Sequence, residues 1–193
     1  MAEYKNFSLE ELLKHTHDHA SWYWLGMAYW GRRDFRNAAA WLEKTMNDTG
    51  NEWAGKARLN LALLHKGGLH PHASKDEALR LFEKNMSGPM SNLNAGFLYC
   101  EGTETKQNSE KGKELIEKAI ELLIQEDGND NYLSQKECYD IGWVYYKENN
   151  GKAYKWFEKC IARCNESYPN DRWLKDTAIR NIDVLHRDGV KEI

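Results

Sequence analysis

Apolar positions along the chain recur with the spacing of amphipathic helices, and one eight-residue pattern is written five times. Each copy has an aliphatic residue or alanine, usually a small residue next, and Tyr or His three positions later. The copies are LGMAYWGR at 25–32, LALLHKGG at 61–68, AGFLYCEG at 95–102, IGWVYYKE at 141–148 and IDVLHRDG at 182–189. A second helical stretch ending in Glu-Lys follows four of them, so the sequence predicts tandem pairs of helices.

Small residues stand at matching points of the two helices in each pair. The pairs are Gly26 with Ala38, Ala62 with Ala78, Gly96 with Gly112 and Gly142 with Ala153. Antiparallel helices joined by a short turn approach most closely where side chains are missing, so we expect close contacts at these pairs. The small-residue column recurs at intervals of roughly 34–46 residues, which is typical of a repeat array in which each helical hairpin stacks on the next.

Segments rich in Gly, Pro, Asn and Asp separate the hairpins. We expect one domain, 1–193, with repeats at about 20–50, 53–87, 89–126 and 132–167, a first cap helix at 8–18 and a C-terminal cap helix at 171–189. Ser8 and Glu11 have the spacing of a capping box at the start of the first helix. That helix either shields the end of the array or folds into its groove, and we favour the cap. The predicted class is all-α, an α-solenoid of tandem antiparallel helical hairpins.

The residues of the repeat are similar to those of known families. Trp22, Leu25, Gly26, Tyr29 and Ala38 resemble the tetratricopeptide repeat. The copies at Ala95–Gly102 and Ala153–Cys160, and the variable spacing, are more similar to its relative, the Sel-one-like repeat. This resemblance covers about 20–189 and implies a right-handed superhelix that serves as a protein-binding scaffold. His65 and His186 in place of Tyr, and Asp183 in place of a small residue, depart from the pattern.

A second face of the first helices, at offsets −3, +1 and +4 from the small residue, lines the concave groove in proteins that this chain resembles. Here that face is mostly apolar and aromatic, which indicates an interaction site. The residues that we assign to a partner-binding groove are Tyr23, Met27, Trp30, Lys66, Phe97, Tyr139, Trp143, Tyr146 and Arg180. The alternative for the leucines of this face, Leu59, Leu63 and Leu93, is that they are core between neighbouring hairpins.

Composition and charge narrow the class of partner. A hydrophobic content of 41% with eight Trp describes a folded chain. A net charge of −3 and the absence of a basic stripe predict no nucleic-acid partner. The N-terminal sequence has no basic start followed by an apolar run, and no stretch approaches about 20 apolar residues, so we expect no membrane segment and a cytoplasmic location. Four Cys without a C-x-x-C pair predict reduced thiols used in packing.

Candidate chemistry is limited to one histidine cluster. His15 and His19, with His17 between them, would share a helical face as zinc ligands can, but no Cys or Glu completes a recognisable spacing. We therefore expect no cofactor and no catalytic residue, and predict an adaptor, not an enzyme, that binds a peptide, helix or loop of a partner protein. One alternative is a bacterial immunity or antitoxin-like protein that neutralises a cognate toxin. The other is a metal-dependent enzyme built on His15 and His19.

Overall fold

The computed structural model describes residues 4–48, 50–104, 106–127 and 132–193, and every regular element in these ranges is a helix. A 3-10 helix η1 (Tyr4–Asn6) and a short helix α1 (Leu9–Leu13) come first. The helices that follow are α2 (His19–Gly31), α3 (Phe35–Asn47), α4 (Ala54–Lys66), α5 (Lys75–Glu83), α6 (Pro89–Glu101), α7 (Ser109–Asp127), α8 (Gln135–Tyr146), α9 (Lys152–Arg163) and α10 (Pro169–Arg187). The predicted all-α class is confirmed.

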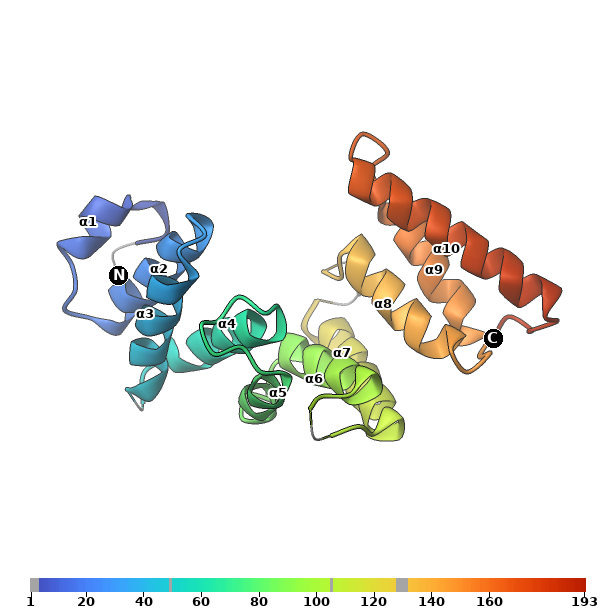
Figure 1. Ribbon diagram of the computed structural model, residues 1–193, viewed down its shortest axis with the longest axis horizontal. Helices are drawn as coiled ribbons and strands as arrows, with labels where there is room; N and C mark the ends of the chain where they lie inside the picture. Colours follow the sequence, from blue (N-terminus) through green and yellow to red (C-terminus); the bar gives the residue numbers. More distant parts are fainter. Residues whose placement is uncertain (1–3, 49, 105, 128–131) are drawn as a thin grey trace. The chain divides into compact units, whose positions relative to one another are not determined.

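The helices form two compact units, Met1–Leu115 and Ile116–Ile193, with the boundary inside α7. In the first unit, consecutive helices from α2 to α6 contact one another in turn (Figure 1). In the second unit, α9 packs against both α8 and α10, and α10 also contacts α8. Contacts within each unit do not show whether the two units form one domain, so the single domain over 1–193 stays a prediction.

The first helix begins as the sequence predicts but ends earlier. Ser8 and Glu11 form the capping box, in which the Glu11 N–H donates to Ser8 Oγ (3.3 Å) and the Ser8 N–H donates to the Glu11 carboxylate (2.7 Å). α1 nevertheless ends at Leu13 instead of 18, because Asp18 is the N-cap of the next helix. The Asp18 carboxylate accepts a hydrogen bond from the Ser21 N–H (2.8 Å), and a turn separates the two helices.

The closest approach between paired helices occurs at Gly96 and Gly112. A methyl group at Gly112 would lie 2.7 Å from the Gly96 carbonyl oxygen and 3.0 Å from the Cys100 amide nitrogen, and it would also overlap with Cys100 Sγ. α6 and α7 therefore cross almost in backbone contact, and the contact predicted for this pair is confirmed.

The glycine of the fourth repeat makes room for an aromatic side chain of the second helix. A methyl group at Gly142 would lie 2.8 Å from the Phe157 ring, and the nearest atoms all belong to that side chain and none to Ala153. The missing side chain accommodates a phenyl ring from one turn further along α9. The pairing of Gly142 with Ala153 stays a prediction, whereas the need for a small residue at this position is confirmed.

The glutamate that recurs in the second helices links the second and third hairpins to the ones that follow them. The Tyr99 hydroxyl donates to Glu83 (2.5 Å), and the Tyr145 hydroxyl donates to Glu117 (3.1 Å). Lys152 Nζ also donates to Glu117 (2.6 Å). Both tyrosines occupy the Tyr column of the eight-residue pattern, so this glutamate stabilises the stacking of repeats and is not a candidate for catalysis.

His65 replaces the tyrosine of that column in the second repeat. Its ring is 7% exposed and stacks on the ring of His70, with the centroids 3.9 Å apart. The His65 Nδ1 atom is buried and has no hydrogen-bond partner among the residues that the structure describes, whereas His70 Nε2 lies 3.2 Å from Glu43. Burial, with a smaller contribution from the charge of His70, lowers the pKa of His65 below its ordinary value.

We expect His65 to make the protein less stable in mild acid. Below pH 6.5 the unfolded chain takes up a proton at His65 that the folded chain does not bind. As the pH is lowered, this group therefore decreases the free energy of unfolding by at most about 1.4 kcal/mol per pH unit. Urea unfolding of the wild type and of His65→Phe at several pH values between 7.5 and 5.5 measures the difference in slope. His17→Ala, which removes an exposed histidine, should keep the wild-type slope. An unchanged slope in His65→Phe would contradict this explanation.

Candidate partner-binding surface

The unit boundary separates the predicted groove residues into two sets that differ in exposure. The set in the first unit is Tyr23, Met27, Trp30, Lys66 and Phe97, all buried or half-buried. The set in the second unit is Tyr139, Trp143, Tyr146 and Arg180, of which Trp143 and Arg180 are exposed and the two tyrosines half-buried. The second unit therefore offers the more accessible surface.

In the first unit, Tyr23 and Phe97 are packing residues, only 9% and 3% exposed. The Tyr23 ring lies 5.1 Å from the ring of Trp53, and its hydroxyl accepts a hydrogen bond from Asn60 Nδ2 (3.0 Å). Burial raises the pKa of the Tyr23 hydroxyl. Phe97 lies under the ammonium group of Lys66, 5.1 Å from its ring centroid. The prediction that Tyr23 and Phe97 offer open groove surface is wrong, because neighbouring side chains cover both rings.

The other predicted residues of the first unit are partly covered as well. Met27 lines a small cavity of about 200 Å³ together with Tyr4 and Phe7, so the N-terminal segment lies over this side of α2. Trp30 packs edge-on against Phe35, with centroids 6.5 Å apart. These contacts leave little continuous surface for a partner around Met27.

Lys66 and the leucines of this face also take part in packing. Lys66 Nζ donates a hydrogen bond to Asn94 Oδ1 (2.8 Å), which holds it against α6. Leu93 is fully buried, and Leu59 and Leu63 pack half-buried against the core. The alternative interpretation of the leucines as core is therefore correct for Leu93 and holds in part for the other two.

In the second unit, Tyr139, Trp143 and Tyr146 of α8 form a row of stacked rings, which we call the aromatic ladder. The Tyr139 and Trp143 rings are 6.4 Å apart at an interplanar angle of 11°, and the Trp143 and Tyr146 rings are 5.2 Å apart at 15°. Phe157 of α9 supports the ladder, with centroid distances of 5.6 Å to Tyr139 and 6.1 Å to Tyr146. Trp143, in the middle, remains 38% exposed.

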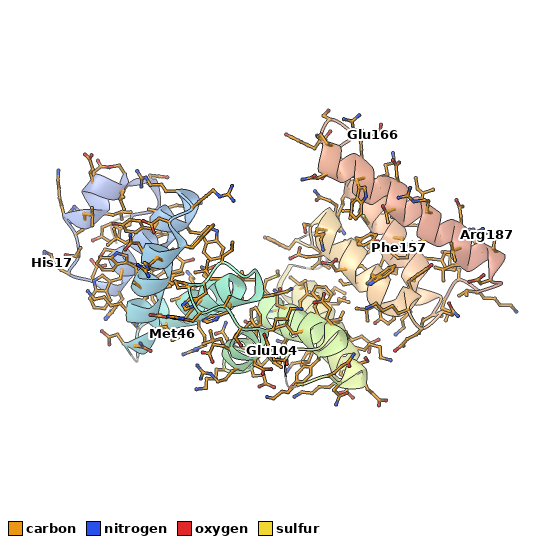
Figure 2. All side chains as sticks on the ribbon, in the orientation of Figure 1. His17, Met46, Glu104, Phe157, Glu166 and Arg187 are labelled. Atoms are coloured by element: carbon orange, nitrogen blue, oxygen red, sulfur yellow. The ribbon has the colours of Figure 1, made fainter. Side chains whose placement is uncertain are left out.

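α10, which packs against α8, carries a second stripe of residues. The stripe occupies the same offsets in α10, −3, +1 and +4 from the small-residue column, as the aromatic ladder does in α8. This stripe consists of Arg180, Val184 and Arg187. Asn181 Nδ2 donates to the Tyr139 hydroxyl (3.4 Å), which fixes the register of α10 against α8. Arg187 lies near the C-terminal end of α10 (Figure 2). A hollow of about 590 Å³ on this side of α10 is lined by Arg180, Asp183, Val184, His186 and Arg187.

The helical pairs coincide with a known repeat. The Sel1 repeat family model matches residues 18–45, 55–84, 89–122 and 131–161, the segments of α2–α3, α4–α5, α6–α7 and α8–α9. The chain belongs to the Sel1 repeat family. Sel1 repeats are helical solenoid repeats that act in general as protein–protein interaction modules and are not typically enzymatic. The predicted family resemblance and the α-solenoid class are confirmed, and no curated protein matches the chain.

In terms of the Sel1 repeats, the aromatic ladder belongs to the first helix of the fourth repeat, and α10 follows the last matched segment. α10 keeps the offsets of a first repeat helix. Arg187 was not among the predicted site residues, but it stands in the same column as Tyr146, and that column could have identified it. Within the described ranges, no helix is long and apolar enough to cross a membrane.

The histidine cluster does not form the helical face that its spacing predicts. α1 ends at Leu13 and α2 begins at His19, so His15 lies in the turn between two helices of different direction. The His15 ring packs 5.7 Å from the Tyr4 ring, and His19 Nε2 lies 2.5 Å from the Asp48 carboxylate. Among the residues that the structure describes, no group of three or more His, Cys, Asp or Glu could hold a metal ion. The shared-face geometry on which the metal-enzyme alternative depends is therefore wrong.

Cys160 of α9 and Cys164, the residue that follows this helix as its C-cap, lie close together at its C-terminal end. Cys160 is fully buried, and its Sγ atom lies 4.0 Å from that of Cys164. Burial raises the pKa of the Cys160 thiol far above its ordinary value, so the nucleophilic thiolate is strongly disfavoured. Among the residues that the structure describes, no disulfide joins any of the four cysteines.

Proposed function

We propose that this Sel1 repeat protein is an interaction scaffold that binds one peptide, helix or loop of a partner on the surface formed by the aromatic ladder and the Arg180 stripe of α10. The observation that carries the proposal is the exposure of Trp143 within a row of rings that α9 supports from the other side. A ring needed only for the core would be covered, as Phe97 is in the same column of the third repeat.

The surface suits binding because its side chains are held in place before a partner arrives. Stacking on both sides fixes the Trp143 ring, and Lys147 Nζ lies 5.7 Å from its centroid. Side chains that are already ordered lose little conformational entropy on binding. Trp, Tyr and Arg are also the residue types most enriched in binding hot spots, and all three are present here.

We expect Trp143→Ala to weaken partner binding by about 30-fold, because removing a central hot-spot aromatic typically costs about 2 kcal/mol. Affinity capture from a cell lysate with quantitative mass spectrometry identifies partners. Fluorescence anisotropy with the captured segment then measures the affinity, and circular dichroism checks the fold. Tyr168→Ala, which removes a 62% exposed ring outside the ladder, is the matched control and should bind like the wild type.

Two results would decide against this assignment. Equal affinity of Trp143→Ala and wild type would show that the ladder is not the binding surface. Loss of helical circular dichroism in Trp143→Ala would show that the ring belongs to the fold. A captured enzyme whose activity the scaffold blocks would favour the immunity-protein alternative within the same interaction class.

A further inference from the structure

The charges around the aromatic ladder differ from those of the chain as a whole, which has a net charge of −3. Arg180 and Arg187 are exposed, and in the part of the chain that the structure describes neither guanidinium has a carboxylate within 4.0 Å. Their hydrogen bonds are to neutral oxygens, from Arg180 to Thr177 Oγ1 (3.0 Å) and from Arg187 to the Asp183 carbonyl (3.4 Å). Both cations are therefore available to a partner.

The cationic side chains on the ladder and the stripe outnumber the carboxylates. Lys147, beside the Trp143 ring, adds a third exposed cation. The carboxylate of Asp140 on α8 is engaged by Lys136 (2.6 Å). Asp183 is the one carboxylate among the residues that line the hollow on α10, and it opposes two guanidinium groups there. An approaching segment with negative charge is attracted, whereas a basic segment is repelled.

The spacing of charged and apolar side chains along α10 determines which partner segment fits this surface. Arg180 and Arg187 are seven residues apart on one helix, so they are separated by about 10.5 Å along its axis. Val184 stands between them, at the offset in α10 that Trp143 occupies in α8. The surface therefore presents a cation, an apolar site and a second cation in sequence. The planar guanidinium of Arg binds a carboxylate through two parallel hydrogen bonds, which adds geometric selectivity.

We propose that the segment bound on this surface is acidic, with two carboxylates about 10 Å apart on either side of an apolar side chain that packs against Trp143 and Val184; this inference rests on the proposed binding surface. The carboxylates pair with Arg180 and Arg187. In a helix the two acidic residues stand about seven positions apart on one face. In an extended segment, where alternate residues face the same side, they stand four positions apart with the apolar residue midway, a span of about 13 Å at roughly 3.3 Å per residue that long Glu and Arg side chains can close.

Selection from a random peptide library displayed on phage, with the full chain as bait, tests the inference. We expect the selected peptides to be enriched in Asp and Glu at one of these spacings, with an aromatic or aliphatic residue between them. The affinity of a selected peptide should fall at least 30-fold in the double variant Arg180→Glu/Arg187→Glu and should weaken with added salt. Arg172→Glu reverses an exposed charge on the same helix outside the stripe, so it should change the affinity by less than about threefold, as expected of a screened surface charge.

The remaining outcomes separate this inference from the proposed function. Selected peptides that are neutral or basic but still require Trp143 would overturn the acidic partner and leave the binding surface in place. If no selected peptide depends on Trp143, the binding surface itself is wrong. A concentration-dependent dimer in analytical ultracentrifugation that Arg180→Glu abolishes would show that a second copy of this chain occupies the surface, and it would overturn the acidic peptide. Circular dichroism of each variant verifies that it is folded.

Discussion

Replacing Phe157 with alanine is expected to lower the free energy of unfolding of the second unit by about 3–5 kcal/mol. The ring is fully buried between α9 and α8, and the backbone of α8 approaches it closely at Gly142. It also supports Tyr139 and Tyr146 of the aromatic ladder. Removing it leaves a cavity that the two helices cannot fill without moving the ladder. Urea unfolding, with hydrogen exchange of the peptides from α8 and α9 to localise the effect, measures the loss.

Two variants control for this result. Phe157→Leu keeps most of the volume and should cost less than about 1.5 kcal/mol. Trp143→Ala removes an even larger ring from the same surface, but that ring is 38% exposed, so its cost to stability should be smaller, about 1–2 kcal/mol for the two lost ring contacts. Phe157→Ala should therefore impair both stability and partner binding, and Trp143→Ala mainly binding. A Phe157→Ala variant as stable as Trp143→Ala would show that the ring does not support α8.

Gly112→Ala is expected to destabilise the first unit by about 3 kcal/mol, the upper part of the range for overpacked sites. Helix propensity alone predicts the opposite, since alanine is favoured over glycine by about 1 kcal/mol inside a helix. Packing decides the sign here. Two of the three atoms that the new methyl group would meet, the Gly96 carbonyl oxygen at 2.7 Å and the Cys100 amide nitrogen at 3.0 Å, belong to the backbone of α6. The two helices must separate to make room.

Gly31 provides the matched control for this substitution. It is the last residue of α2, and a methyl group there would have no atom within 4 Å. Gly31→Ala should therefore stabilise the protein by about 0.5–1 kcal/mol through reduced freedom of the unfolded chain. Thermal and urea unfolding of the two variants gives the comparison. If Gly112→Ala were stabilising like Gly31→Ala, α6 and α7 would not pack as closely as the structure shows.

The periodic features of this protein could be predicted from the sequence. The recurring octapeptide predicted the helical pairs and the family, because 3.6-residue periodicity and a repeated small-residue column are visible without knowing any long-range contact. Ser8 and Glu11 predicted the start of the first helix, since a capping box is local. The close approach of Gly96 to Gly112 followed from the same columns, as each repeat uses one hairpin geometry.

The exposure of the groove residues could not be predicted in this way. Phe97 and Trp143 stand in the same column of their repeats, yet one is 3% exposed and the other 38%. The exact end of α1, at Leu13 and not at 18, was also decided by the tertiary structure.

The sequence by itself determined the order of helices, their pairing and the class of protein. The tertiary structure decided which aromatic residues remain available to a partner. The physical reason is that periodicity assigns a side chain to a face of its helix, whereas exposure depends on what the neighbouring helices place over it. Lys66 of the preceding repeat lies over Phe97, whereas Trp143, stacked between Tyr139 and Tyr146, keeps 38% of its surface exposed.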